Sequence, residues 1–283
     1  MLTANGGQPV TITAVDPAAS FLMFSVRSGS AEADESQVLG RLVDATTVEF
    51  VRQSDAGVPP AIDIEWSVVE YACGVSVQRG LLPGDGTNQI DIPITAATRA
   101  SSFVLGSSVP PAGAADFDAD DLHIFEQVAD DTLRIRSAGS PIVAGRQLAW
   151  QVVSFVGGGD LSAQTVGTTL GPGLGTDTVT LPTPVDVAST FLVASTASTS
   201  TGPEVGERMV RVRLVDATTV EVTRQALSET VEVSIQVVEL GDGSTVRHGV
   251  LDLSSTETTA SVTIPPVDVA RSVAVSTVQS PGS

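Results

Sequence analysis

Lysine is absent from the 283 residues, and cysteine and histidine are nearly absent. All 14 basic residues are arginine, Cys73 is the only cysteine, and His123 and His248 are the only histidines. Schiff-base chemistry on a lysine and lysine-to-asparagine isopeptide crosslinks are therefore excluded. A single cysteine excludes an intrachain disulfide, so packing alone has to hold the fold together. The few titratable groups also leave zinc without ligands and argue against an enzyme.

Positive charge is scarce as well, since the formal net charge is -19 and the pI is about 4.2. Binding of nucleic acid needs clustered lysine and arginine, and an anionic membrane surface repels an acidic chain. No apolar run approaches the roughly 18 to 20 residues of a membrane span, and residues 1–7 lack the basic and apolar regions of a signal peptide. We therefore expect synthesis in the cytoplasm without a Sec signal, no membrane insertion, and release by lysis or by signal-independent export.

The chain repeats itself. The run RLVDATTVEFVRQ at 41–53 returns as RLVDATTVEVTRQ at 213–225, and QVADDTLRIRS at 127–137 is the middle copy. A second block, IEWSVVEY at 64–71, returns at 148–155 and 233–240, so that Trp66, Trp150 and Ile235 are equivalent. A third block occurs four times, with Phe21, Phe103, Phe191 and Val273 in line. The repeats predict three modules and the opening of a fourth.

Each block alternates apolar and polar residues at period two, which is the pattern of a β-strand. Turn residues such as those of PGDG at 83–86 separate the blocks, and no helix of ten residues is expected. The sequence predicts an all-β fold of tandem β-sandwich modules of immunoglobulin-like size. The predicted strands of the first copy are 9–15, 20–27, 37–44, 46–53, 61–72 and 74–82.

The predicted domains are 1–86, 87–173 and 174–257, followed by a partial fourth module of two strands at 258–283. The segment Asp44-Ala45-Thr46-Thr47, repeated at 216–219, predicts a tight hairpin between two strands. We expect Trp66 and Trp150 to pack at the module centres, because a large aromatic supplies much of the buried area there. Exposed platforms that stack on sugars are the alternative for these tryptophans.

One acidic cluster is a candidate metal site. The run ADFDADD places Asp116, Asp118, Asp120 and Asp121 close together, and carboxylate oxygens are calcium ligands. The run lacks the glycine and the distal glutamate of an EF-hand, so a solvated loop is the alternative. Calcium is the only cofactor that the sequence offers, and no catalytic residue is predicted.

At residues 62–80, with W-x-V-V-E at 66–70 and V-Q-R-G at 77–80, the sequence resembles a repeated β-module of bacteriophage virion and bacterial surface proteins. The motif departs in the middle copy, where Ser154 replaces Glu70, and in the third, where Ile235 replaces the tryptophan. These are framework positions, so the resemblance implies a module type and no catalytic site.

Together these features favour a structural component of a phage virion, either a tail or head fibre or a decoration protein. The alternative is a segment of a bacterial surface adhesin or extracellular filament, with modules that serve as spacers or bind glycans. The expected partners are other subunits of the virion or filament, including copies of the chain itself, and a cell-surface glycan is a further candidate. The expected location is the virion or, in the alternative, the bacterial surface.

Overall fold

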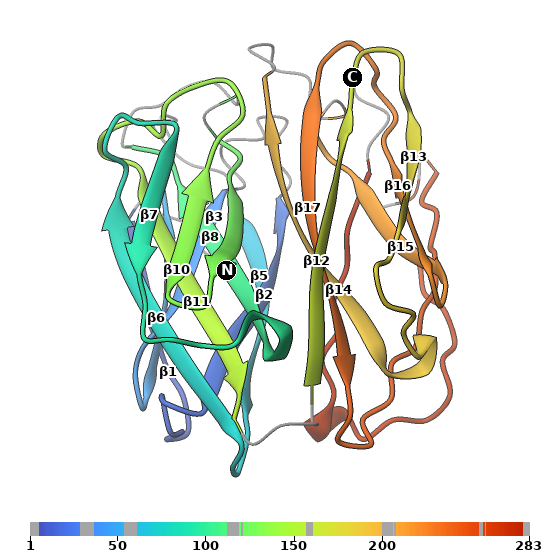
Figure 1. The fold of residues 1–283 in the computed structure, drawn as a ribbon. Coiled ribbons are helices and arrows are strands. Elements are labelled where there is room, and N and C mark those ends of the chain that lie inside the picture. Colours follow the sequence, from blue (N-terminus) through green and yellow to red (C-terminus); the bar gives the residue numbers. More distant parts are fainter. Residues whose placement is uncertain are drawn as a thin grey trace.

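The chain forms small antiparallel β-sheets (Figure 1). The computed structural model describes residues 6–28, 37–53, 61–111, 119, 121–156, 161–199, 206, 208–254, 257 and 259–279. The helical elements of these residues are 3₁₀ turns of three residues, namely η2 (Arg99–Ser101), η3 (Val187–Ser189) and η5 (Val269–Arg271). The all-β class and the sandwich character of the modules are confirmed. No helix in the described part of the chain is long and apolar enough to span a membrane.

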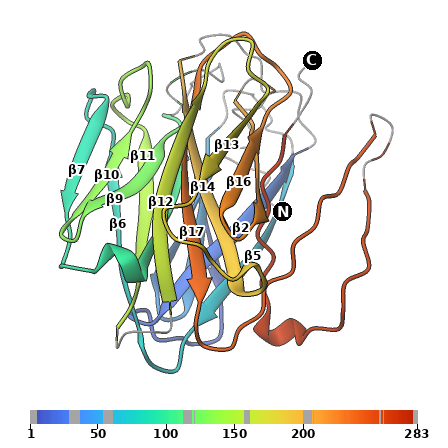
Figure 2. The same ribbon diagram turned by 45° about the vertical axis from the view of Figure 1, so that its right-hand side comes forward.

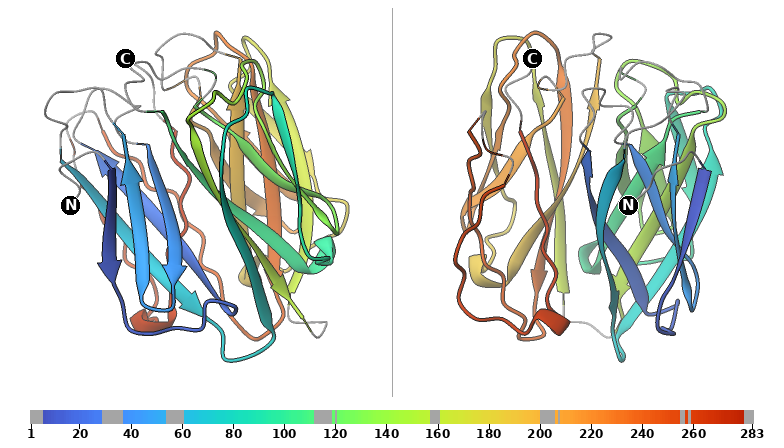
Figure 3. Two further views of the ribbon diagram at one scale, coloured as in Figure 1. Left: turned by 90° about the vertical axis from the view of Figure 1, so that its left-hand side faces the viewer. Right: turned by 180° about the vertical axis from the view of Figure 1, so that it is seen from behind.

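Three sandwiches lie side by side, each built from two small sheets (Figures 1 and 3). Neighbouring strands are antiparallel throughout, and the sheet orders are β1-β4-β3 with β2-β5, β7-β10-β9 with β6-β11-β8, and β13-β16-β15 with β12-β17-β14. The first sandwich comprises β1 (Gly6–Thr11), β2 (Ser20–Ser28), β3 (Val38–Asp44), β4 (Thr47–Arg52) and β5 (Ile62–Glu70). The second comprises β6 (Val75–Pro83), β7 (Gln89–Pro93), β8 (Ser102–Val109), β9 (Ile124–Ala129), β10 (Thr132–Arg136) and β11 (Gln147–Phe155). The third comprises β12 (Leu161–Leu170), β13 (Thr176–Thr180), β14 (Thr190–Ser198), β15 (Arg211–Asp216), β16 (Thr219–Thr223) and β17 (Val231–Leu240).

The predicted hairpin at 44–47 joins β3 to β4, and its geometry recurs between β15 and β16. The Thr46 backbone N–H donates to the Asp44 carboxylate at 2.8 Å, and Thr218 donates to Asp216 in the same way at 2.7 Å. These backbone hydrogen bonds hold the pKa of both carboxyl groups below the ordinary value. An aspartate that accepts a hydrogen bond from the residue two positions on stabilises a tight turn, which explains why this short run repeats.

The register of the strands confirms the alignment of the repeats. Trp66 lies opposite Phe24, Trp150 opposite Gly106, and Ile235 opposite Ala194. The same offset places Phe21, Phe103 and Phe191 opposite Val69, Val153 and Val238.

The linking strand β6 does not pair within the sandwich that precedes it. The sequence boundaries assign this strand to the module at 1–86, whereas its whole length pairs with β11 of the second sandwich. Strand β12 likewise follows β11 in the chain and pairs with β17 of the third sandwich. Each sandwich after the first is therefore completed by a strand that comes directly from the last strand of its predecessor. Period-two alternation predicts which way side chains point, and it carries no information on which neighbour a strand joins.

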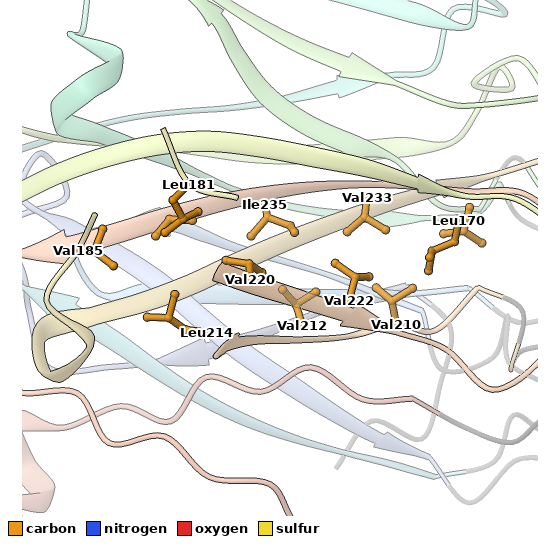
Figure 4. Close-up of a cluster of buried hydrophobic side chains, with 12 residues drawn as sticks. Leu170, Leu181, Val185, Val210, Val212, Leu214, Val220, Val222, Val233 and Ile235 are labelled. Atoms are coloured by element: carbon orange, nitrogen blue, oxygen red, sulfur yellow. The ribbon is translucent and has the colours of Figure 1, made fainter. Parts of the chain in front are cut away.

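Each sandwich has its own apolar core between its two sheets. In the third, valine, leucine and isoleucine side chains from β15, β16 and β17 meet (Figure 4). The sheet that contains β11 or β17 is also buried on its other face, because that face packs against a neighbouring sandwich. Val153 and Val238 lie in the cluster shared between sandwiches, while Val152 and Ile235 lie in the separate cores.

Trp150 is half-buried against the core of the second sandwich, whereas Trp66 is 38% exposed. The expectation that Trp66 packs at a module centre is therefore wrong. The alternation places Trp66 on the correct face, beside Phe50 with ring centroids 6.5 Å apart. Trp66 is exposed because no described strand lies on the outer side of β5, which pairs with β2 alone. Strand β11, which carries Trp150, has β6 on that side.

Trp66→Ala is expected to lower the free energy of unfolding of the first sandwich by only about 1–2 kcal/mol, because a partly exposed ring loses little burial on truncation. Fully buried aromatics lose about 3–5 kcal/mol. Urea unfolding of the parent and variant chains measures the difference. A loss as large as that for a buried phenylalanine would show that the indole is a core residue after all.

The described residues after β17 are extended and belong to no strand. Figure 2 shows them as extended segments, the last of which follows η5. The segments before η5 stand clear of the sheets. Most of their apolar side chains are exposed, including Val262 at 64% and Ile264 at 52%. By the repeat alignment Ile264 is equivalent to Leu181, which is buried in the third core.

Candidate assembly interface

The sandwiches are joined by phenylalanines at one repeat position. The Phe103 ring packs edge-on against Phe21 with centroids 5.7 Å apart, and against Phe191 with centroids 5.6 Å apart. Each ring comes from a different sandwich, on β2, β8 and β14. The Phe103 side chain is deeply buried, with an exposed fraction of 2%. Edge-to-face pairs stabilise beyond the area they bury, so this ring couples all three sandwiches.

A glutamine amide from each later sandwich binds the edge strand of the sandwich before it. The Gln151 amide nitrogen donates to the Leu22 carbonyl at 3.0 Å, and its amide oxygen accepts from the Leu22 N–H at 2.9 Å. Gln236 makes the same two bonds to Val104, at 2.9 Å and 2.6 Å. One side-chain amide thus satisfies both backbone groups of a buried edge residue, as a neighbouring strand would.

Hydroxyl side chains make a third repeated contact. The Ser107 hydroxyl accepts from the Gly40 N–H at 3.2 Å and donates to its carbonyl at 3.3 Å. Ser195 accepts from the equivalent residue of the second sandwich, the Phe125 N–H, at 3.3 Å. Thr277, beyond the last strand, accepts from the Val212 N–H at 3.0 Å and donates to its carbonyl at 3.3 Å. By the repeat alignment Gly40, Phe125 and Val212 are one position, so residues near 277 dock on the third sandwich as β8 docks on the first.

The linking strand also binds the sandwich that it leaves. The Val77 N–H donates to the Ala18 carbonyl at 2.8 Å, and the Val246 N–H donates to the Ala188 carbonyl at 2.7 Å. The Arg79 guanidinium donates to two carbonyls of the first sandwich, and the ring Nε2 of His248 lies 3.1 Å from the Val187 carbonyl oxygen. Residues 244–249 therefore follow the third sandwich as β6 follows the first.

Two ionic contacts lie at the same boundaries. Arg146 and Asp121 form an ion pair of 2.6 Å whose side chains are each 1% exposed, and the Gln37 amide oxygen of the first sandwich accepts from Arg146 at 3.3 Å. Arg136 bridges Glu126 of its own sandwich and Glu232 of the third. A buried charge is costly without a partner, so loss of either member of the first pair would leave an uncompensated charge.

The candidate calcium ligands are only partly placed by the structure. Asp116, Asp118 and Asp120 lie outside the described residues. Asp121 is described, and its carboxylate is buried against Arg146. Within the described ranges, no group of three or more histidine, cysteine, aspartate or glutamate side chains could hold a metal ion.

A cavity of about 380 Å³ lies where the sandwiches meet. It is lined by strands of all three sandwiches and by residues 275–277, and its charged lining residues are Arg41 and Arg79. The described lining includes no carboxylate, histidine or cysteine, so it offers no general acid or base. Cys73 is a free, exposed cysteine. The cavity is best described as imperfect packing between modules.

No family model, curated protein or solved structure matches the chain. The features of the chain that bear on function are the contacts between sandwiches. The glutamines were missed by sequence reasoning, although a signal was present: both LAWQVV and VSIQVV carry glutamine directly after the aligned Trp150 and Ile235. The first copy has Ser67 there.

Gln151→Ala is expected to weaken the coupling of the first and second sandwiches by about 2–3 kcal/mol, because two buried backbone groups of Leu22 lose their partners. Differential scanning calorimetry should show the first sandwich melting separately. Gln8→Ala, on an exposed side chain of β1, is the control and should melt as the parent does. Unchanged cooperativity in Gln151→Ala would show that the amide contributes nothing to coupling.

Proposed function

We propose that the chain is a structural component of a bacteriophage virion, a tail or head fibre or a decoration protein. One observation carries the proposal: successive sandwiches are docked by the same contacts, made by an aromatic ring, a glutamine amide and a hydroxyl at fixed repeat positions. Modules joined in this way hold a fixed geometry, and such a rigid unit can form part of a fibre or cover a surface. The excess of negative charge favours solubility before assembly.

Mass spectrometry of purified phage particles tests the proposal. The protein should be recovered from banded particles in an amount comparable to known particle proteins, and antibodies against it should decorate the particle surface in electron micrographs. Recovery only in the soluble fraction of lysed cells would contradict the proposal.

A bacterial surface adhesin or filament segment is the second candidate, and the exposed indole of Trp66 favours a glycan-binding form of it. Aromatic faces at a protein surface stack on sugar rings. Fractionation of cells would then place the protein in the envelope, and Trp66→Ala would remove binding on a glycan array. Binding that survives in Trp66→Ala would exclude Trp66 as the platform.

A further inference from the structure

We propose that the open edge of β5 binds residues 244–253 of a second copy of the chain as an added antiparallel strand, with Gly249 opposite Trp66. This inference deepens the proposed structural function and rests on it for its biological meaning. The proposed occupant is a segment of the chain itself, because β6 with β11 and β12 with β17 are two examples of the same pairing.

The acceptor is an edge strand that is more open than its equivalents. Strands β11 and β17 each lie between two neighbours, and nearly all of their residues are buried. Strand β5 has β2 on one side and no described strand on the other, and its middle residues Glu65 and Trp66 are exposed. An uncovered edge presents backbone N–H and C=O groups that a further strand can satisfy.

The donor is already in the conformation of a linking strand. Residues 244–254 are extended, exposed except at Val246, and held on the third sandwich by the same contact that holds β6 on the first. Figure 2 shows this segment standing clear of the sheets. Leu251 and Leu253 are 49% and 54% exposed, so their apolar side chains are uncovered in the single chain.

The side chains of donor and acceptor match in the register that β6 and β11 use. In that pairing Val77 lies opposite Val153, Gly80 opposite Trp150, and Leu82 opposite Leu148. The equivalent pairs between copies are Val246 with Val69, Gly249 with Trp66, and Leu251 with Ile64. Two of the three pairs are aliphatic on both strands, and cross-strand pairs of this kind stabilise a sheet.

The glycine is the specific element of the match. A Cβ on Gly80 would lie 2.6 Å from the Trp150 ring, so the indole needs a glycine opposite it. In the third sandwich the smaller Ile235 stands in place of the tryptophan, and Val166 stands opposite it. A second pair of positions combines a large ring with a glycine in the same way. Phe24 covers Gly40 in the first sandwich, and in the second sandwich the residue types are reversed, so that Phe125 covers Gly106. Trp66 on β5 therefore selects a strand with glycine at this position, and Gly249 supplies it.

The chain's own residues 244–253 are the competing occupant. Burial and, after it, the charge of Asp242 raise the pKa of Tyr71, which places the start of the donor segment near the end of β5 in the same molecule. Pairing within one chain would bury Trp66 without any change of mass. The experiment therefore has to report mass and tryptophan exposure together.

Sedimentation velocity of the full chain over a range of concentrations, with fluorescence quenching of tryptophan, tests the proposal. The parent should self-associate and become less quenched as it does so. Gly249→Val should weaken self-association at least about tenfold, because the valine meets the Trp66 ring. Adding Trp66→Ile to Gly249→Val should restore it, since valine opposite isoleucine is the pair of the third sandwich.

Gly171→Val is the matched control, because nothing lies within 4 Å of a Cβ at either Gly171 or Gly249 in the single chain, so both variants should fold. A monomeric parent at all concentrations, or a Gly249→Val chain that associates as the parent does, would overturn the proposal. A monomeric parent with a shielded Trp66 would assign the pairing to the chain's own strand. These outcomes are independent of whether the protein is recovered from particles, so failure of the strand pairing and failure of the virion role are distinguishable.

Discussion

Phe103→Ala is expected to lower the free energy of unfolding by about 3–5 kcal/mol and to split one cooperative transition into several, because the lost ring leaves a cavity at a place where three sandwiches share aromatic contacts. The Phe103 ring touches Phe21 and Phe191, so its removal weakens both junctions at once. Calorimetry of the parent and variant chains measures the cost and the number of transitions.

Phe50→Ala is the matched control for this experiment. Phe50 is also 2% exposed, but it packs within the first sandwich alone. The control should lose about as much free energy as other buried phenylalanines do, with the loss confined to one sandwich. If Phe103→Ala unfolds in a single transition like the parent, the shared aromatic cluster does not couple the modules, and the structural proposal loses its main support.

The coupling explains how short modules can hold together as one unit. Each sandwich has few strands and a small core, and small domains bury too little surface to be very stable alone. Here one sheet of the second and third sandwiches is buried on both faces, against its own partner sheet and against a neighbour. Stability of this kind is shared between neighbours, as in other repeat proteins, and it is independent of disulfides.

The repeat pattern predicted much of the fold correctly. Five of the six strand positions in the first copy, the hairpin at Asp44 and the equivalence of Trp66, Trp150 and Ile235 are confirmed, whereas the first strand, predicted at 9–15, spans Gly6–Thr11. These features depend on local turn chemistry and on period-two alternation, both of which are visible within a few residues.

Features that depend on neighbours in space were not predictable in the same way. Alternation gave the correct face for Trp66, yet whether a further strand covers that face depends on which sandwich β6 joins. The partners of Gln151 and of Asp121 are distant in sequence, on Leu22 and Arg146. Polar side chains at interfaces show no period, and only their recurrence at one repeat position, as for Gln151 and Gln236, could have marked them.

His123 predicts a second large effect, on the response of the second sandwich to acid. Its imidazole is 5% exposed, and neither ring nitrogen has a hydrogen-bond partner among the described residues. Burial and, after it, the charge of Arg146 lower the pKa of His123 to about 3. The chain therefore buries a neutral histidine, whose protonation in the folded state is costly.

His123→Leu is expected to make the second sandwich more resistant to acid than the parent. In the unfolded chain a histidine takes up a proton below about pH 6.5, whereas in the folded chain it stays neutral until about pH 3. The unfolded state therefore binds more protons in this window, and the parent loses about 1.4 kcal/mol of stability per pH unit as the pH falls through it, in addition to the loss from its carboxylates. The leucine variant lacks the histidine component and keeps the carboxylate one. Urea unfolding of the parent and the variant at pH 7, 6, 5 and 4, followed by tryptophan emission, measures the slope. Equal slopes in the parent and the variant would show that His123 is accessible to protons in the folded protein.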